Sequence, residues 1–465
     1  MKTLSKICDV ADWFDPELIR VIEQELQEPA RFHRKQWEFA MIFHTLEKLG
    51  YLHGSSTGLS MGGGNERVLY SIAKHIKKLV VTDLYEENTT WDTARTNDPT
   101  DFILSSKPFP LDNKKLEVQR MDMRHLEFGD QEFDFCYSSC AFEHIGEYQD
   151  FLQHLHEVYR VLVEGGVYVF TTEFHFGEET IQDDHNYIFS ADYLRQLLKD
   201  CPLSLAVHPN VSITHHTANQ PLPHNINNLL YLGEIFKEHP LNEQIPHLYL
   251  LRGKYPFTSI LFILKKEPIP SQNDIRFTGF PTTKTFLNSR LTKYRKWLEH
   301  SPLKINPFSS LPNGVSRFYQ DHAEFFNKDR ENHQTDPTFF HSDYFWFGNG
   351  KRTFTIELTD VSHLSDEPVE LLFKIHRYAT MNSSEVECCI EQKVIISKTS
   401  SKALNVLLTT PVDENYCYAI LGHHLKGDFK FGQIQLLTTS EDISQGTTIQ
   451  NREMNHHTDV ESSWI

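Results

Sequence analysis

The stretch Gly58-Leu-Ser-Met-Gly-Gly-Gly-Asn-Glu66 is followed, after a short helical pattern, by Leu79-Val-Val-Thr-Asp83. The two segments predict a strand, a glycine-rich turn, a helix and a second strand that ends in a carboxylate. Asp83 follows Gly62 by 21 residues, close to the spacing of about 20 in βαβ units that bind a nucleoside. Glycines let the backbone approach a ligand, and the carboxylate can accept ribose hydroxyls. The pattern predicts a site for a cofactor that contains adenosine.

The glycine loop differs from two other kinds of nucleotide loop. A dinucleotide loop reads G-x-G-x-x-G, whereas Gly62-x-Gly64 is followed by Asn65-Glu66-Arg67 without a third glycine. Glu66 places a negative charge at the helix N-terminus, where a pyrophosphate would bind. The motif G-x-x-x-x-G-K-[ST] of nucleoside triphosphate sites is missing. A cofactor with a ribose and a cationic amino-acid end, such as S-adenosylmethionine, suits the loop better, although an ordinary glycine-rich turn explains the loop taken alone.

The segments after Asp83 continue the alternation of strands and helices. Apolar residues at 151, 152, 155, 158, 159 and 162 recur with helical spacing and predict a helix over about 147–162. Such an alternation is typical of a parallel sheet with crossover helices. The third to seventh strands are expected at Leu116–Asp122, Glu132–Ser139, Val167–Glu173, Leu203–Ile213 and Thr258–Leu264.

The order of these signals resembles the class I S-adenosylmethionine-dependent methyltransferases. The chain is similar to bacterial members of that family that have a helical lead-in of the type His33-Arg-Lys-Gln-Trp37-Glu38 and a G-x-G-x-E loop. Two further motifs are an Asp-Leu-Tyr after the second strand and a Glu-His-Ile-Gly turn after the fourth. The resemblance covers about residues 30–175 and fades toward 266. It implies a Rossmann-like α/β sheet preceded by helices.

The resemblance also implies a set of cofactor-binding residues. The chain departs from the family at Ser60, where the first strand often carries an acid, and at Glu66, where a glycine is common. Glu66 is expected to supply the charge that holds the methionine ammonium. The cofactor-binding residues carried over from the motifs are Gly62, Gly64, Glu66, Asp83, Leu84, Asp122, Met123 and Ser139.

Composition limits the classes of partner and compartment. The formal net charge is −18, from 63 acidic and 45 basic residues, which argues against a broad nucleic-acid footprint. The sequence contains no run of 18 apolar residues, so no membrane span is expected. The N-terminus lacks the apolar region of a secretory signal, so no such signal is expected. The seven cysteines show no C-x-x-C spacing, so reduced thiols in a cytoplasm are expected.

The chain of 465 residues is too long for one methyltransferase core, so further domains are expected. From Thr353 the hydrophobic period changes to two, which predicts several short strands and an all-β, sandwich-like domain. That domain could mediate a homodimer. An insert at about 214–254 could be a lid over the substrate, or a surface loop that does not contact the substrate. The predicted divisions are 1–53 (helical cap), 54–268 (methyltransferase domain with an insert at about 214–254), 269–340 (helical connector), 341–440 (β domain) and 441–465 (mobile tail).

Catalytic candidates are expected at the carboxyl ends of the strands, where ligands bind in open α/β sheets. His144 after the fourth strand, or His175 after the fifth, could act as a base because imidazole titrates near neutral pH; otherwise each only shapes the pocket. Glu173 could orient an acceptor hydroxyl or amine, or be a buried carboxylate bonded to backbone amides. No metal ion is expected, because no strong ligand signature is formed by Glu173, His175, Asp183, Asp184 and His185.

The leading functional prediction is O-methylation of a polar small molecule or a glycan-like acceptor. The glycan idea comes from the β domain, where Tyr344-Phe-Trp346-Phe347 could be a platform for a sugar or simply hydrophobic packing. An N- or C-methyltransferase of a secondary metabolite would use the same cofactor site. A different class is a non-catalytic methyltransferase-like scaffold that binds a protein partner. A nicotinamide-dependent oxidoreductase would need the missing third glycine.

Overall fold

The structure is a computed structural model of the chain. It describes residues 3–87, 89, 91–183, 186–221, 246–252, 255–268, 274–300, 305–306, 316–319, 322–325, 338–342, 345–378, 386–397 and 403–441. These residues group into two compact units, divided between Tyr294 and Arg295 and called the first and second unit from here on. Most of the predicted insert and nearly all of the predicted tail lie outside the described residues. The finer boundaries near 53, 268, 340 and 440 stay predictions.

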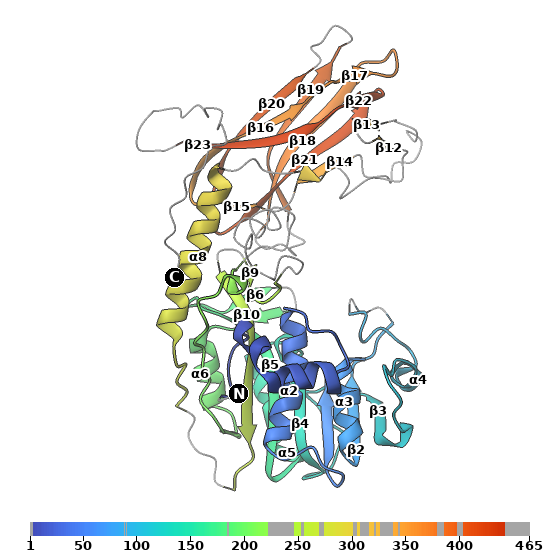
Figure 1. Ribbon diagram of the computed structural model, residues 1–465, viewed down its shortest axis with the longest axis vertical. Coiled ribbons are helices and arrows are strands. Elements are labelled where there is room, and N and C mark those ends of the chain that lie inside the picture. Colours follow the sequence, from blue (N-terminus) through green and yellow to red (C-terminus); the bar gives the residue numbers. More distant parts are fainter. Residues whose placement is uncertain are drawn as a thin grey trace. The chain divides into compact units, whose positions relative to one another are not determined.

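The first unit is built on an eight-stranded sheet with the order β3-β2-β1-β4-β5-β10-β8, in which β9 pairs with β10 (Figure 1). The first five of these strands run parallel, whereas β10 is antiparallel to β5. The predicted Rossmann-like α/β sheet is therefore confirmed. Its strands are β1 (Thr57–Met61), β2 (Lys78–Asp83), β3 (Leu116–Arg120), β4 (Phe133–Ser139), β5 (Leu162–His175), β8 (Ser204–Leu205), β9 (Leu250–Arg252) and β10 (Tyr255–Lys265).

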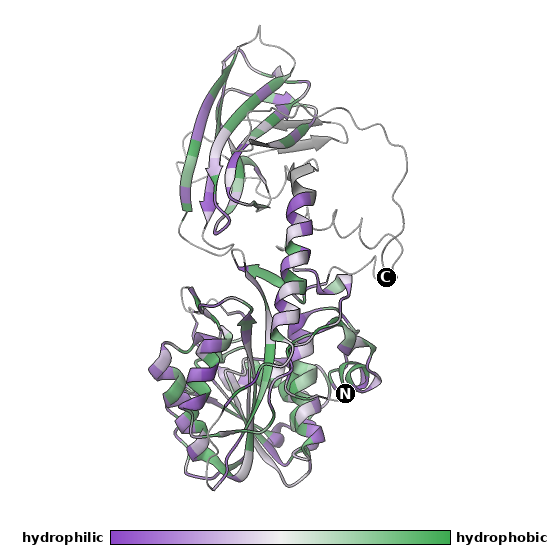
Figure 2. Ribbon diagram, turned by 90° about the vertical axis from the view of Figure 1, so that its left-hand side faces the viewer, coloured by the Kyte–Doolittle hydropathy of each residue, from purple (hydrophilic) through white to green (hydrophobic). Residues whose placement is uncertain are grey.

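Helices flank this sheet, and the hydropathy colouring of Figure 2 places the most hydrophobic segments of the first unit in the strands between them. α2 contacts β4, β5 and β10 and thereby reaches the middle of the sheet. The helices of this unit are α1 (Pro16–Arg20), α2 (Arg34–Lys48), α3 (Arg67–His75), α4 (Pro99–Ser105), α5 (Tyr148–Val161) and α6 (Ala191–Lys199). The short helical turns are η1 (Val10–Phe14), η2 (Val21–Glu25), η3 (Asn113–Lys115), η4 (Phe142–His144) and η5 (Thr217–Asn219).

Most predicted elements of the first unit agree with the structure within a few residues. The helix predicted over 147–162 is α5, whose first turn is closed by reciprocal hydrogen bonds between Glu147 and Asp150. The predicted sixth strand was wrong in length, because β8 ends at Leu205. Pro209 has no N–H to donate to a strand ladder, and Val211 bonds to Thr278 instead. A two-stranded hairpin, β6 (Ile181–Asp183) and β7 (Asn186–Ile188), follows β5.

The second unit is antiparallel throughout its described strands, as expected from the period of two. Alternate residues of β16 and β18 are buried. Phe347 contacts Phe354 of β16 and Tyr418 of β21, so side chains of two sheets pack together. The strands form three sheets, with the orders β11-β14-β21-β18-β19 (β15 pairs with β21), β12-β13-β22-β17 and β20-β16-β23.

The bounds of the remaining elements complete the description. α8 (Phe280–His300) contains the division between the units. The strands of the second unit are β11 (Ile305–Asn306), β12 (Ser316–Tyr319), β13 (His322–Phe325), β14 (Thr338–Ser342), β15 (Phe345–Trp346), β16 (Gly350–Leu358), β17 (Ser362–His363), β18 (Val369–Tyr378), β19 (Val386–Ile396), β20 (Leu404–Val412), β21 (Cys417–Lys426), β22 (Phe429–Phe431) and β23 (Ile434–Glu441). None of the described helices combines the length and apolar content needed to cross a bilayer.

Two members of the predicted aromatic platform are part of the core of the second unit. Phe345 and Phe347 are buried, and their rings lie 6.0 Å apart. The Arg352 guanidinium lies 4.2 Å from the centre of the Phe347 ring. These contacts favour the packing interpretation for both residues. Tyr344 lies outside the described residues.

Candidate cofactor and acceptor site

The glycine loop between β1 and α3 is shaped by backbone conformations that glycine adopts most easily. Gly62 has φ +62° and Gly64 has φ +43°, both in the left-handed region. A Cβ on Gly62 would lie 2.4 Å from Ala141 Cβ. A Cβ on Gly64 would lie 2.7 Å from the carbonyl oxygen of Thr93. Larger residues would therefore clash with the segments that face the loop.

Asp83 ends β2 beside this loop and is held by the backbone. Its Oδ2 accepts a hydrogen bond from Gly64 N at 2.9 Å, and its Oδ1 accepts one from Leu84 N at 2.7 Å. Burial raises the pKa of Asp83, although the backbone hydrogen bonds oppose that shift. Each carboxylate oxygen can accept more than one hydrogen bond. The glycine loop and the carboxylate that the sequence motif relates by their spacing are thus in direct contact.

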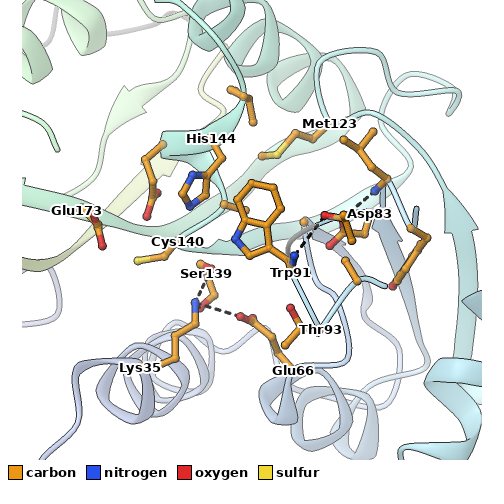
Figure 3. A pocket seen from close by; sticks show the side chains of 18 of the residues that line it. Lys35, Glu66, Asp83, Trp91, Thr93, Met123, Ser139, Cys140, His144 and Glu173 are labelled. Carbon is orange, nitrogen blue, oxygen red and sulfur yellow. Dashed lines mark hydrogen bonds and ion pairs between the residues drawn. The ribbon is translucent and has the colours of Figure 1, made fainter. Parts of the chain in front are cut away.

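A cavity of about 700 Å³ opens at the carboxyl ends of the strands. In Figure 3, Asp83 and Glu173 lie on opposite sides of it, with Trp91 and His144 between them. The structure brings most of the predicted site residues together here. Those that line the cavity are Gly62, Glu66, Asp83, Leu84, Asp122, Met123, Ser139, His144 and Glu173.

The first turn of α2 contributes two cations that the sequence motifs did not single out. Lys35 Nζ lies 3.1 Å from Glu66 Oε1 and 3.2 Å from Glu38 Oε2, and it donates to the carbonyl of Ser139 at 2.9 Å. Arg34 Nη2 lies 2.5 Å from Glu173 Oε1. An ion-pair chain, in the order Glu66, Lys35, Glu38, Arg34 and Glu173, therefore connects the glycine loop to the end of β5.

Charge is not balanced within this ion-pair chain, because three carboxylates share two cations. Glu38 is fully buried, yet Lys35 and Arg34 overcome the effect of burial and lower its pKa. The opposite holds for Glu66, where burial outweighs Lys35 and raises the pKa to about 7. Glu66 Oε2 is buried without a hydrogen-bond partner among the described residues. A cationic group of a ligand would complete this end of the chain.

Glu143 is a further carboxyl group on the cavity wall. It lies in η4 directly after β4 and is 1% exposed. Its Oε2 accepts a hydrogen bond from Thr172 Oγ1 at 2.9 Å. Burial, and next the charge of Glu173, raises the pKa of Glu143 to about 8. The sequence contains this residue beside His144, but no pattern distinguished the two.

The aromatic part of the cavity comes from the loop after β2, which carries Trp91, and from η4, which carries His144. The Trp91 and His144 rings have centroids 5.1 Å apart and planes inclined by 56°, and Trp91 is 48% exposed. Its loop is fixed to the glycine turn, because Asn65 N donates to the carbonyl of Thr93 at 2.9 Å. After the carboxyl end of β3, Asp122 is bound by Arg124, and this pairing outweighs burial and lowers the pKa of Asp122.

Other predicted residues lie away from the cavity lining. The His175 ring packs against Tyr255 with centroids 5.2 Å apart, and its Nδ1 accepts a hydrogen bond from Gly177 N. Burial lowers the pKa of His175 to about 4. Asp184 and His185 lie outside the described residues. Within the described part of the chain, no three His, Cys, Asp or Glu residues form a group suited to a metal ion.

Comparison with known proteins gives one family match. A family model described as "Methyltransferase domain" matches residues 59–170, which include the end of β1, the glycine loop, Asp83 and η4. A search among proteins of curated function finds no match.

Solved structures with a similar fold each align with about half of the chain. The YcgJ protein from Bacillus subtilis is 14% identical, with 50% of this chain and 99% of that one covered and a TM-score of 0.33. The [4+2]-cyclase SpnF is 12% identical, with 57% of this chain and 99% of that one covered and a TM-score of 0.34. Geranyl diphosphate C-methyltransferase from Streptomyces coelicolor, solved with Mg²⁺, geranyl diphosphate and S-adenosyl-L-homocysteine, is 13% identical (56% and 90% covered, TM-score 0.33). Residues 59–170 therefore match a methyltransferase domain, and they lie on the Rossmann-like α/β sheet of the first unit.

Proposed function

We propose that the first unit binds S-adenosylmethionine in the cavity and catalyses O-methylation of a polar acceptor. The observation that carries the proposal is the Asp83 carboxylate, fixed by Gly64 N and Leu84 N at the edge of a cavity of about 700 Å³. Such a carboxylate is suited to accept the two hydroxyls of a ribose. The bound cofactor supplies a methyl group already activated by a sulfonium, so the protein has no electrophile to generate.

The residues of this chain fit the parts of that cofactor. Gly62 and Gly64 keep the space beside the loop free of a Cβ. Glu66 Oε2 is buried and unpartnered among the described residues, and it offers an acceptor for the methionine ammonium. This assignment gives Glu66 the role that the acid missing at Ser60 often has in the family. Met123 would contact the adenine, as the resemblance of its motif implies, and Leu84 lines the same cavity.

The opposite side of the cavity supports a polar acceptor. Glu173 is anchored there by Arg34 and by Asn186, whose Nδ2 donates to Glu173 Oε2 at 3.2 Å. A carboxylate held on two sides can accept a hydrogen bond from an acceptor hydroxyl and fix its position. The packing of Phe345 and Phe347 inside the second unit removes two residues from the predicted sugar platform. The proposal therefore rests on the cavity and names a polar acceptor with hydroxyl groups.

Isothermal titration with S-adenosylhomocysteine tests the cofactor assignment. We expect the natural protein to bind the ligand and Asp83→Ala to lose at least tenfold in affinity, because hydrogen bonds to a charged group contribute about 1.5–3 kcal/mol. Asp92→Ala is the matched control, since Asp92 is exposed in the same loop. If the natural protein does not bind at millimolar ligand, or if both variants bind like the natural protein, the assignment fails.

A further inference from the structure

Glu143 has a place in the cavity that binding of the cofactor does not require. Glu143 lines the cavity, and its carboxyl group is oriented by the Thr172 hydroxyl, which donates to Oε2 at 2.9 Å. Thr172 lies on β5 next to Glu173, so both carboxyl groups are positioned by the same strand end. A buried carboxyl group without a structural ion pair has a free-energy cost. This cost indicates that Glu143 has a role in the reaction.

The charges around Glu143 leave it without a cation of its own. Among the described residues it forms no ion pair, because the guanidinium of Arg34 is engaged by Glu173 at 2.5 Å and by Glu38 at 3.5 Å. Burial and the nearby carboxylates therefore raise the pKa of Glu143 to about 8. The titratable and charged groups that face it are Arg34 and Glu38 from α2, Glu173 and Tyr168 from β5 and Cys140 from the loop after β4.

Methyl transfer to a hydroxyl changes the charge of the cavity in a defined way. An oxygen–carbon bond forms and the carbon–sulfur bond breaks, and the sulfur keeps the electron pair and becomes a neutral thioether. The oxygen–hydrogen bond of the acceptor also breaks, and its proton must be received by a base. One positive charge disappears from sulfur and one proton appears. A nearby carboxylate gains proton affinity when a neighbouring cation is lost.

We propose that Glu143 accepts the proton of the acceptor hydroxyl during methyl transfer. The positive charge lost at sulfur then stays in the cavity as a proton on this carboxylate. The inference rests on the proposed function and deepens it, because it assigns a base to the same site. Glu173, which is paired with Arg34, holds the hydroxyl, and the neighbouring Glu143 receives its proton.

Proton release on ligand binding tests this assignment without a known acceptor. S-adenosylmethionine and S-adenosylhomocysteine share the adenosine and the ammonium and differ by the methyl group and the sulfonium charge. At pH 7.5 a carboxyl group with a pKa of about 8 is about three-quarters protonated. Titration calorimetry in buffers of different ionisation enthalpy should show that S-adenosylmethionine releases about half a proton more than S-adenosylhomocysteine.

Two variants make the measurement specific. Glu143→Gln should bind both ligands and lose the difference in proton release, whereas Glu164→Gln, exposed at the opposite end of β5, should keep it. Equal proton release with both ligands in the natural protein would overturn the inference, and so would a difference that persists in Glu143→Gln. Failure of the natural protein to bind either ligand would instead overturn the proposed function, and the inference with it. Once an acceptor is turned over, Glu143→Gln should lower kcat by about 10²–10⁴-fold with KM for the cofactor changed less than about threefold.

Discussion

The ammonium of Lys35 lies 3.1 Å from Glu66 Oε1, which joins the first turn of α2 to the end of the glycine loop. Lys35 also lies 3.2 Å from Glu38, so one cation serves two carboxylates. The negative charge available to a ligand at Glu66 therefore depends on a helix that precedes the sheet in the sequence. This dependence means that α2 contributes to the cofactor site through charge as well as through packing.

Removing this cation should weaken cofactor binding in a pH-dependent way. In Lys35→Met, burial is no longer opposed by the ammonium, so the pKa of Glu66 should rise further and its carboxylate should be protonated at pH 7. We expect affinity for S-adenosylhomocysteine to fall about tenfold at pH 7 and to recover by pH 9. Calorimetric titration at both pH values measures this. Lys48→Met, at the exposed end of the same helix, is the control, and an equal loss at both pH values would contradict the explanation.

Glycine is favoured at Gly62 both by its positive φ and by the lack of space for a Cβ. Comparison with Gly50, which follows α2, separates these two effects. Gly50 has φ +81° with nothing within 4 Å of an added Cβ, whereas Gly62 has φ +62° and a Cβ that would meet Ala141. Gly50→Ala should lower the free energy of unfolding by about 1 kcal/mol through backbone strain alone. Gly62→Ala should cost about 2–4 kcal/mol because the clash adds to the strain. It should also weaken S-adenosylhomocysteine binding at least tenfold. Urea unfolding and calorimetry test both values, and equal costs would refute the role of Ala141.

Local spacing predicted the part of the site that local backbone geometry creates. Asp83 and Gly64 belong to one βαβ unit, so their contact follows from a turn, a helix and a parallel strand. The same holds for the sheet order around β1, because hydrophobic strands that alternate with helices form a parallel sheet. For this reason most of the predicted cofactor residues line the same cavity, although Gly64 is not among the lining residues.

The ion-pair chain could not be predicted, because Glu66 and Glu173 are distant in the sequence from the residues of α2 that join them. Arg34 and Glu173 are 139 residues apart, and no local period relates a helix start to the end of a strand formed much later. The sequence named His144 as a candidate base because imidazole titrates near neutral pH. It gave no reason to name Glu143, because the burial that raises the pKa of this carboxyl group to about 8 comes from the tertiary structure. His175 was named as a second candidate base, but its ring packs against Tyr255 and is not among the residues that line the cavity.

The buried Glu66 should make stability depend on pH. Its pKa is about 7 in the folded protein and about 4.5 for an ordinary glutamate, so the folded state binds more protons between these values. The free energy of unfolding should therefore fall as pH rises from about 4.5 to 7, by at most about 3 kcal/mol from this residue. In Glu66→Gln that part of the decline should vanish. Urea unfolding from pH 4.5 to 8 measures it, with Glu164→Gln as the control. A decline that is unchanged in Glu66→Gln would show that other groups cause it.

Burial should determine how much an ion pair contributes to the free energy of unfolding. Two ion pairs with the same nitrogen–oxygen distance allow a comparison. Arg34–Glu173 and Arg377–Glu387 both have nitrogen–oxygen distances of 2.5 Å. The side chains of the first pair are 17% and 9% exposed, and those of the second are 32% and 61% exposed. Arg34→Met should cost about 3–5 kcal/mol, since Glu173 and Glu38 then lack a cation. Arg377→Met should cost less than about 1 kcal/mol.

Double-mutant cycles measure the coupling within each pair. Combining Arg34→Met with Glu173→Gln should restore part of the lost stability, because the second change removes a carboxylate that the first leaves unpaired. The coupling from urea unfolding should exceed about 2 kcal/mol for this pair and stay below about 0.5 kcal/mol for Arg377 and Glu387. Similar couplings in the two pairs would mean that Arg34 positions Glu173 without stabilising its charge. The anchoring of an acceptor by Glu173 would then depend on Asn186, and Asn186→Ala rather than Arg34→Met should raise KM for the acceptor.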